Sequence, residues 1–198
     1  ALAVPPPGLI EAAAGVGATN IYLDLDGVAR EAPLAVSAEQ TLFPAFWLEL
    51  LRVLEGLDPA EVHAGPRRIE LPNRTIPAND NLEVLINYVG GYRKFPRLAY
   101  DAAMQMPLSD LRKGVAGKIV VVGTDLAGVT PLLGTPTAPS MPGVEVAATV
   151  TENLVADHML RRPPPWVPPV LALVLALSIG GLAASSLIPT DTRRSGTG

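Results

Sequence analysis

The stretch Gly117-Lys-Ile-Val-Val-Val-Gly-Thr-Asp-Leu-Ala-Gly-Val-Thr-Pro131 decides the expected fold. Residues 118–123 are expected to form a strand, and its wholly apolar part, 119–122, predicts that it is covered on both faces. A helix is expected from Pro142 to about His158, with Glu145, Thr149, Glu152 and Asn153 on its polar face. A buried strand followed by an amphipathic helix predicts an α/β domain, in which a layered sheet has flanking helices.

Further elements are predicted on either side of this unit. Residues 20–26 read as a strand that ends in a turn at Gly27, and residues 82–88 alternate as a half-buried strand. Apolar residues recur at helical spacing from Phe43 to Leu54, with Gly56 in the stop position. Shorter helices are expected at 9–14, 100–104 and 108–112. Together these segments predict one globular domain over residues 1–162.

The C-terminal part has a different character. Residues Val170 to Ile188 are nineteen uncharged residues, which as a helix would span roughly 28 Å against about 30 Å of hydrocarbon. This predicts a transmembrane helix over 170–188, with Trp166 at the membrane interface; a buried core helix is the alternative. Residues 163–169 then form a proline-rich connector and 189–198 a polar tail. Two arginines flank the segment on each side, so charge does not fix its orientation.

Composition excludes several classes of function. The net charge is −4, and no basic stripe is present to neutralise phosphates, so nucleic acid is not an expected partner. The chain has no Cys, which excludes a disulfide framework and thiolate metal sites but fits either a periplasm or a cytosol. Its two histidines stand apart from acidic neighbours at metal spacing, so no metal or other cofactor is expected.

Two segments could carry chemistry. Ile21-Tyr-Leu-Asp-Leu-Asp-Gly-Val28 matches the first motif of haloacid-dehalogenase-like phosphatases, in which Asp24 would attack phosphorus, Asp26 would handle a proton and Mg²⁺ would join them. A later carboxylate pair to complete that metal site is missing, so a turn shaped by the two aspartates is the favoured interpretation. The phosphatase remains the alternative function.

The second segment, residues 123–134, follows the predicted central strand, where open α/β sheets usually bind ligands. It has no phosphate-binding glycine pattern and no Walker lysine. One interpretation is a simple connection whose Thr and Gly residues satisfy turns. The other is a ligand pocket, for which the candidate residues are Arg30, Thr124, Asp125, Thr135 and Thr137.

Taken in order, several motifs resemble one known family. These are Asp24-x-Asp-Gly-x-x-Arg30, the aromatic-rich helix from Phe43, the glycine-rich stretch 117–131, Met141-Pro-Gly-Val-Glu-Val146 and Arg162-Pro-Pro-Pro-Trp166. The chain resembles the second type of CHASE domain, the cyclase- and histidine-kinase-associated sensory extracellular domain. The resemblance implies a non-catalytic sensor outside a bacterial cytoplasmic membrane, truncated at its N-terminus here. It also implies an intracellular output enzyme, which is a nucleotide cyclase, a kinase or a diguanylate cyclase.

The expected mechanism is signal input. A stimulus would shift the helix from Pro142 to His158, and the stiff residues Pro163, Pro164 and Pro165 would couple that shift to the membrane segment. Residues before about 166 are expected to be extracytoplasmic. The expected partners are the membrane and an unidentified small-molecule or protein stimulus, with a homodimer as an open alternative.

Overall fold

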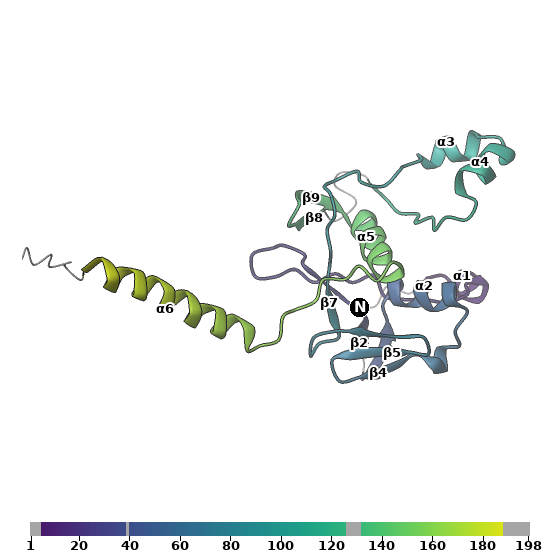
Figure 1. Ribbon diagram of the computed structural model, residues 1–198. Helices are drawn as coiled ribbons and strands as arrows, with labels where there is room; N and C mark the ends of the chain where they lie inside the picture. The colour runs from purple at the N-terminus through teal and green to yellow at the C-terminus, as the bar shows by residue number, and fades with distance from the viewer. Residues whose placement is uncertain (1–4, 39, 126–131, 188–198) are drawn as a thin grey trace, which may run out of the picture. The chain divides into compact units, whose positions relative to one another are not determined.

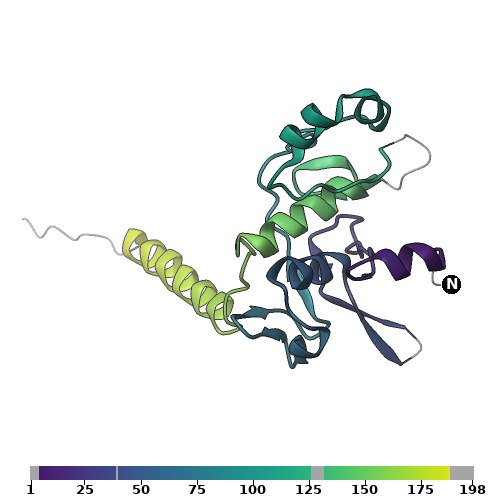
Figure 2. The same cartoon turned by 90° about the vertical axis from the view of Figure 1, so that its right-hand side faces the viewer.

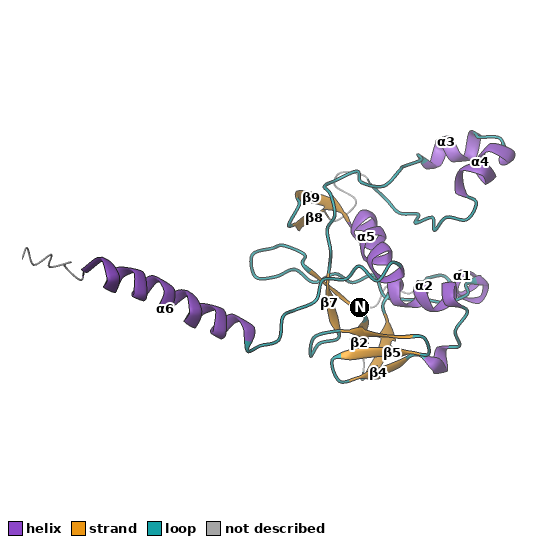
Figure 3. Cartoon of the chain, viewed as in Figure 1, coloured by secondary structure: helices purple, strands orange, loops and turns teal. Residues whose placement is uncertain are grey.

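The computed structural model describes residues 5–38, 40–125 and 132–187 (Figure 1). The chain divides into two compact units, Ala1–Arg161 and Arg162–Gly198. The first unit mixes helices and strands, and the described part of the second contains one helix (Figure 3). The two units are described separately below.

The described elements are mostly short. The helices of the first unit are α1 (Pro7–Ala12), α2 (Phe46–Glu55), the 3-10 turn η1 (Pro59–Glu61), α3 (Tyr100–Gln105), α4 (Leu108–Val115) and α5 (Gly143–Val155). The strands are β1 (Glu31–Pro33), β2 (Ala35–Ala38), β3 (Thr41–Pro44), β4 (His63–Gly65), β5 (Arg68–Leu71), β6 (Arg74–Pro77), β7 (Glu83–Leu85), β8 (Leu132–Thr135) and β9 (Ala138–Pro142). The mixed α/β class is therefore confirmed.

Within the residues that the structure describes, the strands form four small sheets, which differs from the layered sheet that was predicted. Strand β1 pairs with β7, β2 with β3 and β8 with β9, while β4, β5 and β6 form a meander. Every one of these pairings is antiparallel. Short antiparallel ribbons need only local turns, and proline and glycine interrupt the chain often enough to keep the strands short.

The core of the first unit is built around α2. Trp47, Leu48 and Leu51 of this helix are buried, and the indole nitrogen of Trp47 donates to the carbonyl oxygen of Pro33 at 2.6 Å. Gly56 ends the helix in the left-handed conformation, with φ 69°, which costs glycine least. The helix predicted from the periodicity of residues 43–54 is thus confirmed, with its first turn replaced by β3.

Helix α5 lies against α2 (Figure 2) and completes the same core. Val146, Val150 and Leu154 are buried, and Glu145, Thr149 and Asn153 are buried as well. The prediction that these three residues form an outward polar face is therefore wrong. Their polar groups have partners inside the protein: Thr149 donates to the carbonyl of Glu145, and Asn153 exchanges hydrogen bonds with the backbone of Asn87.

The two strands expected from residues 20–26 and 118–123 are not formed. Neither segment is a strand in the part of the chain that the structure describes, and Leu23, Val120 and Val122 are exposed. A strand exists only through hydrogen bonds to a neighbouring strand. The first segment instead turns back on itself, since the amide of Asp24 donates to the carbonyl of Val28 at 3.0 Å. Because residues 20–26 do not form a strand, they offer the apolar residues 119–122 no neighbouring strand with which to pair.

Three predicted helices are confirmed as α1, α3 and α4. None of the three has a buried residue. The predicted strand 82–88 is shorter than expected and pairs as β7, with Ala32 opposite Val84. The meander and the β8–β9 ribbon were not predicted.

The second unit contains α6 (Val167–Leu187), which follows a turn at Pro165 and Trp166. The amide of Val167 donates to the carbonyl of Pro164 at 3.0 Å. Among the helices that the structure describes, none has the length and apolarity that a bilayer crossing demands. The transmembrane helix predicted over 170–188 is therefore unsupported, and its last residue, like the tail 189–198, lies outside the described residues.

Candidate functional site

The predicted phosphatase motif forms a turn closed by Arg30. The guanidinium of Arg30 pairs with Asp24 at 2.5 Å and with Asp26 at 2.7 Å. The amide of Val28 also donates to Asp26. The hydrogen bonds from Arg30 lower the pKa of Asp26, and the same contacts raise the pKa of Arg30.

This geometry favours the turn over the phosphatase. Both carboxylates that would serve as nucleophile and proton carrier already neutralise one guanidinium. Within the described residues no three acidic, His or Cys side chains gather as a possible metal site. A Mg²⁺ ion would have to displace Arg30 with only two carboxylates to hold it, and Mg²⁺ binds through oxygen ligands in a strict octahedron.

The turn also meets the β8–β9 ribbon. The amide of Ala29 donates to the carbonyl of Gly134 at 2.8 Å, and a Cβ at position 134 would lie 3.0 Å from the carbonyl oxygen of Gly27. Glycine at 134 therefore permits the close approach. This contact places the backbone of Thr135 next to the Arg30 turn.

Two of the three predicted threonines, Thr135 and Thr137, lie at the turn of the β8–β9 ribbon. Thr135 is buried, and its hydroxyl bonds both the amide and the carbonyl of Ala138, at 3.0 Å each, so it shapes the ribbon turn. Thr137 is exposed at that turn, and Thr124 is exposed just before Asp125. Residues 126–131 of the predicted pocket lie outside the described residues.

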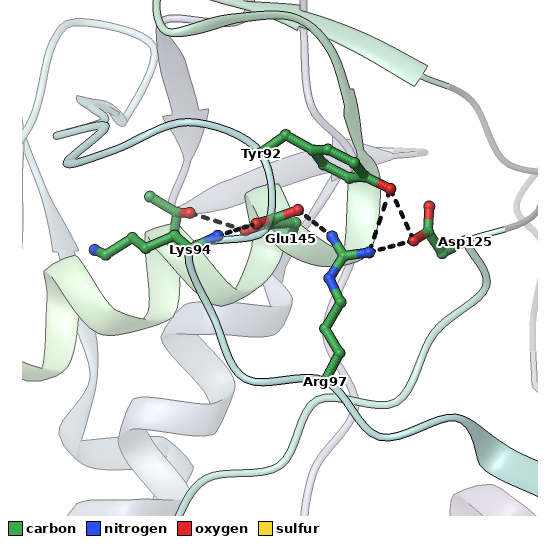
Figure 4. Close-up of polar contacts among 6 residues, drawn as sticks. Tyr92, Lys94, Arg97, Asp125 and Glu145 are labelled. Carbon is green, nitrogen blue, oxygen red and sulfur yellow. Dashed lines mark hydrogen bonds and ion pairs between the residues drawn. The ribbon is translucent and has the colours of Figure 1, made fainter. Parts of the chain in front are cut away.

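Asp125, in contrast, belongs to a polar cluster that spans three segments of the chain (Figure 4). The guanidinium of Arg97 forms ion pairs with Asp125 through one nitrogen and with Glu145 of α5 through the other. The hydroxyl of Tyr92 donates to Asp125 at 3.2 Å. The backbone amide of Lys94 donates to Glu145 at 2.9 Å. We call Tyr92, Lys94, Arg97, Asp125 and Glu145 the Arg97 cluster.

The loop after Gly90 brings these side chains together. Gly90 has a positive φ of 97°, which glycine adopts readily because it has no Cβ. The loop turns toward α5 from this residue. The ammonium of Lys94 then reaches Glu152 on the same helix at 2.5 Å. Contacts with Glu145 and Glu152 thus fasten the loop to α5 over two of its turns.

The charge balance of the cluster explains why Glu145 can be buried. Its side chain is 4% exposed, and an ionised carboxylate at such a depth is costly without a partner. Arg97 and the amide of Lys94 supply that compensation. Burial acts to lower the pKa of Arg97, but the hydrogen bond to Tyr92 and the charge and hydrogen bond of Glu145 raise it overall. The guanidinium carbon of Arg97 also lies 4.6 Å from the centroid of the Tyr92 ring, which adds a cation–π interaction.

Sequence reasoning found one member of this cluster. Asp125 was a candidate because it follows the predicted strand 118–123. No role was predicted for Tyr92-Arg-Lys-Phe-Pro-Arg97, although cationic and aromatic residues lie close together in this segment. Together with Glu145, a carboxylate at the start of an otherwise apolar helix, this segment was the signal that could have indicated the ion pair between Arg97 and Glu145.

Comparison with known proteins identifies the class. The family model of the CHASE2 domain matches residues 2–185, and the chain therefore belongs to the CHASE2 domain family, as the resemblance suggested. Members of this family are sensory extracellular domains rather than catalytic ones. Neither the curated proteins nor the solved structures include a significant match to the chain.

Proposed function

We propose that this chain is the extracytoplasmic input domain of a bacterial transmembrane receptor and that it couples a stimulus to an intracellular cyclase or kinase. The observation that carries the proposal is the match to a sensory extracellular family over residues 2–185. Within the domain, the Arg97 cluster supports the assignment of a sensing site. It combines charge, a partly exposed position and direct contact with α5.

Helix α5 is the element through which a local change would act. Arg97 and Lys94 hold its first turns. Near its other end, Arg74 donates to the carbonyl of Leu154 at 2.8 Å while pairing with Glu55 of α2. A stimulus that changed the contacts of Arg97 would alter the balance between two positions of a helix that is fastened at both ends.

The proposed route continues through the prolines into α6. Replacing Pro163, Pro164 and Pro165 by Gly-Ser-Gly should leave the first unit folded, because these residues are exposed. The swap should weaken control of the output enzyme, since a Gly/Ser linker is flexible whereas polyproline is semi-rigid. The measurement is output activity of the full-length receptor with and without its stimulus.

The control for this experiment is the same receptor with Pro5, Pro6 and Pro7 replaced by Gly-Ser-Gly, because these prolines are also exposed but precede the first unit's core. Regulation should be normal in the control and reduced by at least half in the linker variant. Unchanged regulation in both variants would contradict the proposed route.

The proposed location is the bacterial cytoplasmic membrane, with residues before about 166 outside it. Support comes from the sensory extracellular family and from α6, which contains no charged residue and exposes the leucines from Leu171 to Leu177. Trp166 is also exposed, and an aromatic ring there suits the interface of a bilayer. The proposal is that these apolar side chains attach the domain to the membrane.

A charge in α6 tests this location. Leu173→Lys with Leu177→Lys should move the chain from the membrane fraction to the soluble fraction, because a lysine costs roughly 3 kcal/mol deep in the hydrocarbon. Leu54→Lys is the matched control, since Leu54 is exposed on α2 in the first unit. Equal membrane retention of the unchanged chain, the double lysine variant and the Leu54→Lys control would contradict the attachment. A reporter that is active only outside the cytoplasm gives a second test: fused before Ala1, it would contradict the location if it stayed inactive.

A further inference from the structure

Arg97 is shared by two carboxylates of different accessibility. Glu145 is 4% exposed and is also held by the amide of Lys94, whereas the side chain of Asp125 is 36% exposed. Within the described residues, Asp125 contacts Arg97 and the hydroxyl of Tyr92. Removing Glu145 would bury an unpaired charge, but removing Asp125 would expose a guanidinium to solvent. Asp125 is therefore the exchangeable partner.

A second guanidinium lies beside the same aromatic ring. The guanidinium carbon of Arg93 is 5.3 Å from the Tyr92 centroid. Within the described residues Arg93 forms no ion pair. Its backbone has φ 70°, a conformation that is uncommon and strained for a residue with a long side chain and that often marks functional positions. Release of Asp125 would leave Tyr92 with two cations and no exposed anion.

We propose that this place binds a small carboxylic acid whose carboxylate replaces that of Asp125 on Arg97 and Tyr92. The inference rests on the proposed sensory function and names the ligand class for that site. Arg97 and Tyr92 already bind the carboxylate of Asp125, so the distance between them suits the carboxylate of a ligand. Arg93 is placed to attract a second anionic group of the ligand. Glu145 stays on the other nitrogen of Arg97 and keeps the guanidinium oriented.

Exchange of carboxylates would give the site its output. Asp125 is linked to α5 through Arg97, which also pairs with Glu145, so release of Asp125 breaks that link. The bound ligand would then stabilise the arrangement in which α5 is held by the 90–97 loop without Asp125. A ligand shifts such an equilibrium only by its difference in affinity for the two states.

The tethered Asp125 competes with any ligand, and this makes the proposal testable. A tethered group acts at an effective concentration in the millimolar range, so a free acid binds weakly while Asp125 is in place. Asp125→Asn removes the charge and keeps the shape. A hydrogen bond to a charged group is worth more than one to a neutral group, so this variant should bind a carboxylate about tenfold more tightly.

The experiment is calorimetric titration of the 198-residue chain with succinate. Asp125→Asn should bind about tenfold more tightly than the unchanged chain, and Arg93→Gln should bind several-fold more weakly. The matched control is Asp110→Asn, which removes the same charge from an exposed position on α4 and should leave the affinity unchanged. Circular dichroism checks that each variant is folded, and Arg93→Gln provides the test should Asp125→Asn fail to fold.

Three results would overturn the proposal. They are absence of succinate binding by Asp125→Asn at millimolar concentration, an equal gain in the Asp110→Asn control, and an unchanged affinity in Arg93→Gln. Failure of the sensory function has a different signature: succinate binds as expected, but the full-length receptor shows the same output with and without it. The ligand class and the receptor role can thus fail independently.

Discussion

Trp47→Ala is expected to lower the free energy of unfolding by about 3–5 kcal/mol, the usual cost of truncating a large buried aromatic residue. Trp47 is 1% exposed in the core between α2 and the strands. Its indole also donates to the carbonyl of Pro33 at 2.6 Å. The substitution therefore leaves both a cavity and a buried acceptor without its donor. Urea unfolding followed by circular dichroism measures the loss.

The chain supplies its own control for this experiment. Trp166, the second tryptophan, is 63% exposed, so Trp166→Ala should change the unfolding free energy of the first unit by less than about 0.5 kcal/mol. Similar losses in both variants would show that Trp47 is not in the core that holds the domain together.

Asn153→Leu is expected to cost about 2–4 kcal/mol in unfolding free energy, because it removes the two hydrogen bonds that a buried side chain makes to the half-buried backbone of Asn87. Asn153 is 1% exposed. Its side-chain oxygen Oδ1 accepts from the backbone amide of Asn87 at 2.7 Å, and its side-chain nitrogen Nδ2 donates to the backbone carbonyl of Asn87 at 3.2 Å. Leucine has a similar size but satisfies neither group, so the segment after β7 loses its partner on α5.

The same substitution at an exposed position gives the comparison. Asn20 is exposed, and Asn20→Leu should be close to neutral. Hydrogen exchange adds a residue-specific measurement: the amide of Asn87 should lose protection in Asn153→Leu and keep it in Asn20→Leu. Full protection of Asn87 in the leucine variant would contradict the role assigned to Asn153.

The helices were the most predictable part of the fold. In α2 the apolar spacing and the terminal glycine agree with the structure, because a helix makes its hydrogen bonds within one segment and needs only one face covered. The position of α5 was also predictable. The burial of its polar residues was not, since the partner of Asn153 lies 66 positions away in the sequence.

Strands were predicted less well, for a related reason. The apolar residues 119–122 meet the usual criteria for a buried strand, yet no strand is formed there in the described part of the chain. A strand depends on a neighbour that the pattern of one segment does not specify. The same holds for the site: Asp125 was predicted from its local setting, but its pairing with Arg97 joins positions 28 apart.

The position of α5 near the end of the first unit has a consequence for how this domain folds. Its contacts with Asn87 and Arg74 span 66 and 80 positions of sequence. Contacts of such high sequence separation slow folding. During synthesis, Trp47 and its neighbours stay exposed until α5 has left the ribosome. About 100 further residues must be added first, which takes about 5–20 s at the usual rates of translation. The nascent chain is therefore a natural client for chaperones that shield apolar surface.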